Sequence, residues 1–170
     1  MTAEQFEECL KALSIQFNDY FNEMAPAIVG SVAVEYYKGR FDAQGWDGQG
    51  WPRAKRLTNP KNYHIITKGA RKGQEVALPK AGNPLTLVGT GLLRHSIEVK
   101  ESNSEHVVIW TNPSSFESTE PYGRVHNEGL RAGRGAGFIM PKRQFMGYTE
   151  ELGDMIMERL EEELQKAIKN

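Results

Sequence analysis

The four histidines of this sequence are the first candidates for chemistry, because imidazole titrates near neutral pH and also ligates metals. They are His64, His95, His106 and His126. The sequence contains no HExxH zinc motif, no GxSxG nucleophile motif and no phosphate-binding GxxxxGK loop. His126-Asn127 matches a fragment of a histidine nuclease motif, but such a nuclease also needs a placed general base and metal ligands, for which we recognise no spacing here. The sequence therefore predicts no enzyme, no cofactor and no metal site, and we expect His126 to pack on a short helix and to hydrogen-bond a backbone group.

Two tryptophans stand in the glycine-rich stretch Gly45–Pro52. Its glycines permit left-handed backbone angles and close approach of the chain. A tryptophan buries about 200 Å² and can pin a loop to a core, but it can equally anchor a protein–protein interface. Pinning is the favoured role for Trp51, whereas both roles stay open for Trp46.

Basic residues form clusters in the middle of the chain. The first contains Arg53, Lys55 and Arg56, and a second lies at residues 68–72. Such clusters in a loop are commonly solvated, and they also suit docking onto an acidic protein surface. The alternative function is a nucleic-acid-binding module that uses residues 53–72, but single-strand binding usually interleaves aromatics with the basic residues, and only Tyr63 and a histidine do so here.

Two arginines stand at turns near apolar residues. Arg94 follows two leucines, and Arg143 precedes Phe145. Each guanidinium can donate a bidentate pair of hydrogen bonds to a carboxylate or to free carbonyls. Such bonds would tie loops together within one molecule or fix the register between copies, and the sequence leaves both possibilities open.

The chain has 170 residues, of which 39% are hydrophobic and 25% charged, as in ordinary globular proteins. No apolar run is long enough for a transmembrane helix, and no membrane partner is expected. The only cysteine, Cys9, excludes an intramolecular disulfide, and we expect it to be partly buried. Charge is unevenly distributed. Residues 38–100 carry 12 basic and 4 acidic side chains, whereas residues 1–37 and 146–170 together carry 4 basic and 13 acidic ones. Such separation can pair neighbouring copies of one subunit.

The elements that must position these residues begin with a helical region at 1–39. Thr2 and Gln5 form a capping box, and apolar residues then recur every three or four positions. Pro26 allows either two helices or one kinked helix. Residues 40–88 are expected to be a long loop that contains a hairpin, with strands at 63–67 and 75–78.

The remainder predicts a sheet core at 89–147 and a C-terminal helix at 148–170. Thr90 is expected to cap one helical turn, followed by strands at 96–100 and 106–110. A short helix should open at Pro121 and close at Gly129 before a strand at 138–140. Thr149 should cap the last helix. We expect one α+β domain over 1–170: a small, mostly antiparallel sheet packed with long N-terminal and C-terminal helices and an extended Gly/Trp/Lys-rich loop.

Four motifs in a fixed order resemble the phage virion morphogenesis (tail completion) family. After Phe41, they are Gly48 with Trp51, Thr90–Ile97, Tyr122 with His126 and Gly129, and Pro141–Gly147. Each motif alone is weak, whereas their order before a terminal acidic helix is more specific. The match spans roughly residues 41–169.

This resemblance implies a structural subunit that completes the tail or joins head to tail. Its expected partners are further copies of itself in a ring, with a hexamer favoured, and the neighbouring tail-tube, tail-terminator or head-connector proteins. Genomic DNA would at most pass through the lumen. The expected location is the host bacterial cytoplasm during assembly and then the tail or neck of the virion.

Overall fold

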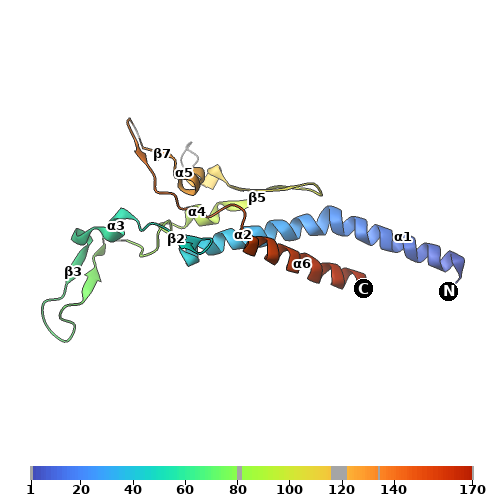
Figure 1. Cartoon of the computed structure of the whole chain (residues 1–170), viewed down its shortest axis with the longest axis horizontal. Helices are drawn as coiled ribbons and strands as arrows, with labels where there is room; N and C mark the ends of the chain where they lie inside the picture. The colour runs from blue at the N-terminus through green and yellow to red at the C-terminus, as the bar shows by residue number, and fades with distance from the viewer. Residues whose placement is uncertain (1, 80–81, 116–121, 134, 170) are drawn as a thin grey trace. The chain divides into compact units, whose positions relative to one another are not determined.

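The computed structural model describes residues 2–79, 82–115, 122–133 and 135–169, and it confirms a mixed α+β fold with long helices at both ends (Figure 1). Pro121 and Arg134 lie outside the described residues. The chain divides into two compact units. Unit 1 contains Met1–Tyr37, Ile97–Asn112 and Gly147–Asn170, and unit 2 contains Lys38–Ser96 and Pro113–Met146. No helix of the described residues is long and apolar enough to cross a membrane.

Unit 1 begins with a helical segment that bends without stopping. Helix α1 (Ala3–Asp19) opens with the predicted capping box, in which Thr2 and Gln5 each bond the other's backbone N–H. A π-helical turn, η1 (Tyr20–Met24), leads directly into α2 (Ala25–Ala43). Pro26 is the second residue of α2 and has no N–H to donate to the preceding turn, which is the π-helical turn η1. The helix thus runs four residues beyond the predicted end at residue 39 and carries Phe41.

Helix α6 (Glu150–Lys169) packs beside this segment. The Thr149 hydroxyl accepts the Leu152 N–H at 3.2 Å, so the predicted cap is confirmed. The hydroxyl of Tyr36 lies 2.9 Å from the Thr149 hydroxyl and donates to Glu151 at 2.8 Å. Further along α6, the Tyr20 hydroxyl donates to the Leu160 carbonyl at 2.6 Å.

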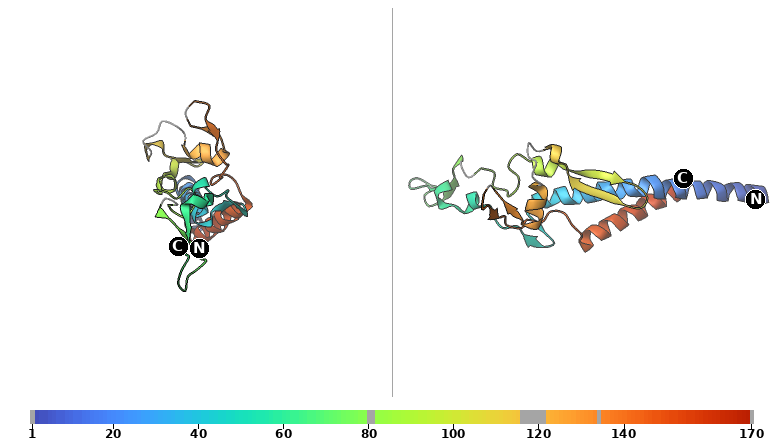
Figure 2. Two further views of the ribbon diagram at one scale, coloured as in Figure 1. Left: turned by 90° about the vertical axis from the view of Figure 1, so that its left-hand side faces the viewer. Right: turned by 90° about the horizontal axis from the view of Figure 1, so that it is seen from above.

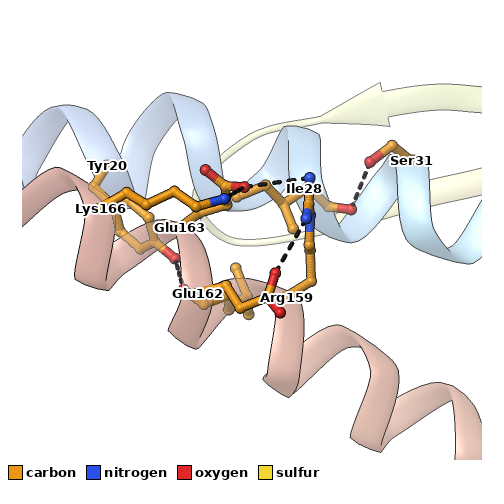
Figure 3. A network of polar contacts seen from close by, with 8 residues as sticks. Tyr20, Ile28, Ser31, Arg159, Glu162, Glu163 and Lys166 are labelled. Carbon is orange, nitrogen blue, oxygen red and sulfur yellow. Dashed lines mark hydrogen bonds and ion pairs between the residues drawn. The ribbon is translucent and has the colours of Figure 1, made fainter.

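An exposed ion-pair network follows on α6 (Figure 3). Glu163 receives Lys166 at 2.9 Å and Arg159 at 3.2 Å, and Arg159 also reaches Glu162 at 3.1 Å. The hydrogen bond from Lys166 is the main cause that lowers the pKa of the Glu163 carboxyl. Pairs spaced by three or four residues stabilise a helix by only about 0.2–0.5 kcal/mol each. These ion pairs join residues of α6 to one another, so they stabilise the helix itself and not its packing against α1 or α2.

The strands of unit 1 form one antiparallel hairpin, β5 (Ile97–Ser102) with β6 (Val107–Thr111). The register shifts between Val99 and Glu101, which is a β-bulge. The hairpin lies along α2, as the yellow-green strands beside the blue helix show (Figure 2). At their contact a Cβ on Gly30 would meet a Val99 methyl at 2.8 Å, so only glycine lets the hairpin approach this closely.

Unit 2 holds three further two-stranded hairpins rather than one continuous sheet. They are β1 (Gly45–Trp46) with β2 (Gln49–Gly50), β3 (Tyr63–Ile65) with β4 (Glu75–Ala77), and β7 (Arg131–Ala132) with β8 (Phe138–Ile139). The predicted hairpin in the long loop is confirmed with shorter strands. The sheet core predicted at 89–147 is instead divided between two separate hairpins, because among the described residues β5–β6 and β7–β8 share no ladder.

Short helical turns also occur in the described part of unit 2. These are α3 (Lys55–Thr58), η2 (Pro60–Asn62), α4 (Leu92–His95) and η4 (Pro113–Ser115). The predicted Thr90 cap is wrong by one residue: Gly91 occupies the N-cap of α4 with φ +78°, a left-handed angle that favours glycine. The short helix α5 (Tyr122–Glu128) ends as predicted, with Gly129 at φ +72°.

Candidate functional site

Three aromatic side chains form the centre of unit 2. Phe41 comes from the last turn of α2, and the Phe41 and Phe145 rings are both fully buried, 5.1 Å apart. Trp51 meets Phe41 edge to face at 5.4 Å, and its indole N–H donates to the Gln144 carbonyl at 2.7 Å. The glycine-rich loop is therefore pinned to the Pro141–Gly147 turn through Trp51.

Asn127 holds the same turn from the other side. Its carboxamide oxygen accepts the backbone N–H groups of Phe145 and Met146, both at 2.9 Å, and its amide donates to the Met146 carbonyl at 3.2 Å. The Arg143 N–H adds a bond to the His126 carbonyl at 2.8 Å. The short helix α5 and the turn at 141–147 are thus one hydrogen-bonded structure, and sequence analysis missed the role of Asn127.

Two arginines are bonded to backbone carbonyls rather than to acids. Arg143 is only 5% exposed and donates to the Pro52 carbonyl at 2.8 Å. Arg56 donates from one nitrogen to the carbonyls of Asn83 and Leu85, both at 2.9 Å. Arg56 therefore organises the long loop, which its membership of a basic cluster did not indicate.

These residues surround a pocket of about 470 Å³ in unit 2. Three of the four sequence motifs contribute to its wall, through Thr90–Leu93, Tyr122 with His126, and Arg143. The remaining lining comes from the long loop: Ala54, Arg56, Thr86, Leu87 and Gly89. The wall combines apolar side chains with two guanidiniums, and none of its described lining residues is a carboxylate.

His126 is 5% exposed and contacts Tyr122 edge to face, with ring centroids 4.6 Å apart. Burial, reinforced by the charge of Arg143, lowers the pKa of His126 to about 4, so the ring is neutral at pH 7. Its Nδ1 has no hydrogen-bond partner among the described residues, so this nitrogen does not make the predicted bond to the backbone. The ring packs against Tyr122.

The other predicted site residues lie around this region. Arg94 makes a bidentate pair with Asp42 at 3.0 and 2.8 Å, an arrangement that joins two segments of unit 2. Trp46 is half-buried in β1, whereas Arg53 and Lys55 are exposed. Outside the site, Cys9 is exposed on α1, so its predicted partial burial is wrong.

The arrangement is suited to binding. Within the described ranges, no three His, Cys, Asp or Glu side chains gather as a metal site. A concave wall with two guanidiniums and apolar neighbours is instead typical of a site that recognises an anionic group.

Comparison with known proteins gives one match. The model of the phage virion morphogenesis family matches residues 1–165. No curated protein and no solved structure matches the chain significantly. The family match covers both units, the aromatic centre and the pocket. The chain therefore belongs to the phage virion morphogenesis family, whose role is the assembly of the phage particle.

Proposed function

We propose that this protein completes the phage tail or joins it to the head, as one subunit of a ring of identical copies. It would assemble in the bacterial cytoplasm and then remain in the tail or neck. Its partners would be its own copies and the adjacent tail-tube, tail-terminator or head-connector proteins. A ring of six copies is favoured, and DNA would at most pass through the lumen.

The observation that carries the proposal is the division of charge between the two units. Unit 1 has 16 acidic and 5 basic side chains, a net charge of −11, whereas unit 2 has 6 acidic and 16 basic ones, a net charge of +10. The whole chain is nearly neutral at −1. Two patches of opposite sign on one subunit favour contact between unlike surfaces of neighbouring copies, and such head-to-tail contacts can close into rings.

An exposed apolar surface on α1 supports the same proposal. None of the 17 residues of α1 is buried, although the helix is amphipathic. Phe6 and Leu10 are each 50% exposed, and Phe17 and Phe21 continue the stripe at 39% and 55%. Contiguous exposed apolar residues on a soluble protein are typical of protein–protein contact sites. We assign this surface to contacts with a virion neighbour.

Charge reversal tests the proposed assembly. Arg53 and Lys55 are exposed in basic unit 2, so the double variant Arg53→Glu/Lys55→Glu should weaken self-association. The matched control, Lys11→Glu/Lys100→Glu, changes the net charge equally but makes acidic unit 1 more acidic. It should leave self-association intact or strengthen it. Sedimentation velocity over a salt series is the measurement, and wild-type association should weaken as salt screens the charges.

Two results would count against the ring. One is a wild-type monomer at low salt that remains monomeric when the tail-tube protein is added. The other is an equal effect of the two double variants, which would show that net charge, and not its division between units, governs association.

A further inference from the structure

The pocket of unit 2 has the size and position of a ligand site. Its volume of about 470 Å³ falls within the range of small-molecule pockets, about 300–1,000 Å³. Its wall combines the apolar side chains of Leu87, Leu92 and Leu93 with the Tyr122 ring. Tyr122 remains 42% exposed, and Leu92 47%, so this apolar wall is open to solvent.

Two guanidiniums in this wall have no carboxylate partner in the part of the chain that the structure describes. A guanidinium has five N–H donors. The bonds to carbonyls use two donors of Arg56 and two of Arg143, the second of which is a long contact to the Arg53 carbonyl at 3.5 Å. Among the described residues neither side chain forms an ion pair, and the pocket lining contains no Asp or Glu. Each guanidinium therefore retains donors for an external acceptor.

The two positive charges act on the same space. Burial lowers the pKa of Arg143, and repulsion by Arg56 lowers it further, whereas the nearby Tyr122 phenol raises it. Burial raises the pKa of Tyr122, and both guanidiniums oppose this change. The phenol thus lies close to both charges, while His126 adds none at pH 7. An anion near the Tyr122 hydroxyl would gain attraction from both arginines and relieve their mutual repulsion.

We propose that this pocket binds a carboxylate carried on an apolar side chain or chain end of a partner polypeptide. The guanidiniums of Arg56 and Arg143 bind the carboxylate, and Leu87, Leu92 and Tyr122 surround its apolar stem. The carboxylate comes either from an Asp or Glu side chain or from a C-terminus, since both present the same group. The source of the polypeptide rests on the proposed assembly role, whereas binding in the pocket is measurable on the protein alone.

A carboxylate fits this pocket better than a nucleic-acid phosphate. Phosphates of DNA follow one another along an extended backbone and are usually bound by exposed lysines and arginines. Here one of the two cations is 5% exposed and both lie beside leucines. A single anionic group on an apolar stem can enter such a pocket, and planar guanidiniums match the geometry of a carboxylate.

Nuclear magnetic resonance titration of the full chain tests the proposal, with the arginine Nε–Hε signals as the readout. N-acetyl-leucine presents a terminal carboxylate, and the α-amide of N-acetyl-leucyl-glutamic acid presents a side-chain carboxylate. N-acetyl-leucinamide is the neutral control, and inorganic phosphate is the competing anion. We expect one or both carboxylate probes to shift the Arg56 and Arg143 signals, and the neutral amide and phosphate to bind at least about tenfold more weakly, because charged hydrogen bonds are lost or poorly placed.

Two pairs of variants show whether a loss of probe binding is caused by the changed charge or by a disturbed fold. Arg56→Gln should weaken binding of the carboxylate probe by about tenfold or more, whereas the neighbouring exposed Arg53→Gln should not change it. If Arg56→Gln disturbs the fold, Leu92→Glu and Leu92→Gln supply the same comparison at an exposed wall position. The glutamate should abolish probe binding by placing a carboxylate at the pocket, and the isosteric glutamine should not.

The proposal is overturned if the neutral amide binds as well as the acids, if phosphate binds more tightly than both acids, or if Leu92→Glu binds the probes like Leu92→Gln. If the protein binds a probe but does not self-associate, the pocket proposal stands and the ring proposal fails. If it self-associates but binds no probe, the ring proposal stands and the pocket proposal fails.

Discussion

The indole N–H of Trp51 donates a hydrogen bond to the backbone carbonyl of Gln144 at 2.7 Å, and the two residues are 93 positions apart in sequence. The Trp51 ring is 9% exposed and also meets Phe41 edge to face. Trp51 thereby connects the end of α2, the glycine-rich loop and the turn at 141–147. This single side chain thus links three of the segments that form unit 2.

Trp51→Phe should destabilise the protein by about 1–3 kcal/mol, because the Gln144 carbonyl loses its donor in a largely buried position. Trp110→Phe is the matched control, since the Trp110 indole N–H makes a long 3.4 Å contact with exposed Glu98. Its effect should be smaller. Urea unfolding followed by far-ultraviolet circular dichroism gives both values, and equal losses would contradict the role assigned to Trp51.

Asn127→Ala should remove the one oxygen that accepts two hydrogen bonds from the turn, and leave the Phe145 and Met146 N–H groups without partners. An unsatisfied buried donor costs about 1–3 kcal/mol, so we expect a loss in that range or somewhat above it. Asn127→Asp keeps both acceptor contacts and loses only the amide donor to the Met146 carbonyl. It should be the milder change in thermal unfolding, and the reverse order would show that the turn is held by other contacts.

Stability should fall as the pH is lowered from about 6.5 to about 4, the interval between the ordinary and the native pKa of His126. The unfolded state binds the proton more readily than the native state, so the contribution is complete above 6.5 and is lost on acidification. Full protonation corresponds to a loss of about 3–4 kcal/mol at 1.4 kcal/mol per pKa unit.

His126→Gln, which cannot titrate, isolates this contribution. Arg143 and Tyr122 lie beside the ring, and guanidinium and phenol groups titrate well above this interval, so they should not contribute to the difference between the two proteins. We therefore expect the unfolding free energy of the variant to change less between pH 6.5 and pH 4. If the unfolding free energies of the wild type and the variant changed equally with pH, His126 would be excluded as the titrating group.

Leu10→Asp should weaken self-association or binding of a virion partner while leaving the fold intact, because Leu10 is 50% exposed on α1. Ala12→Asp is the control, since a residue two positions further along a helix lies on roughly the opposite face. Both variants add one negative charge to unit 1. Equal loss of binding in pull-down with the tail-tube protein would mean that charge, not the apolar stripe, is responsible.

Duplex DNA should bind weakly or not at all, even though unit 2 is basic. The Arg56 side chain is bonded to carbonyls, and the Tyr63 hydroxyl donates to the Leu57 carbonyl, which leaves this ring half-buried. Filter binding over a salt series is the measurement. Tight binding that weakens steeply on a log–log salt plot would favour a nucleic-acid-binding module over residues 53–72.

The sequence by itself determined the elements whose signals are local. The Thr2–Gln5 capping box, the Thr149 cap and the end of α5 at Gly129 depend on neighbouring residues, so they could be predicted without a fold. The same holds for the strands of the β3–β4 and β5–β6 hairpins, which pair with near neighbours along the chain. The order of the motifs also indicated the family, which the match over residues 1–165 confirms.

Only the tertiary structure decided what the side chains contact. The bonds from Trp51 to Gln144, from Arg143 to Pro52 and from Arg56 to Leu85 join residues that are 93, 91 and 29 positions apart. A basic cluster in a loop has the same sequence pattern whether its arginines face solvent or backbone carbonyls. Burial and long-range hydrogen bonding make that distinction, and neither has a local sequence signature. The pocket and its two guanidiniums exist because these distant contacts bring separate motifs together.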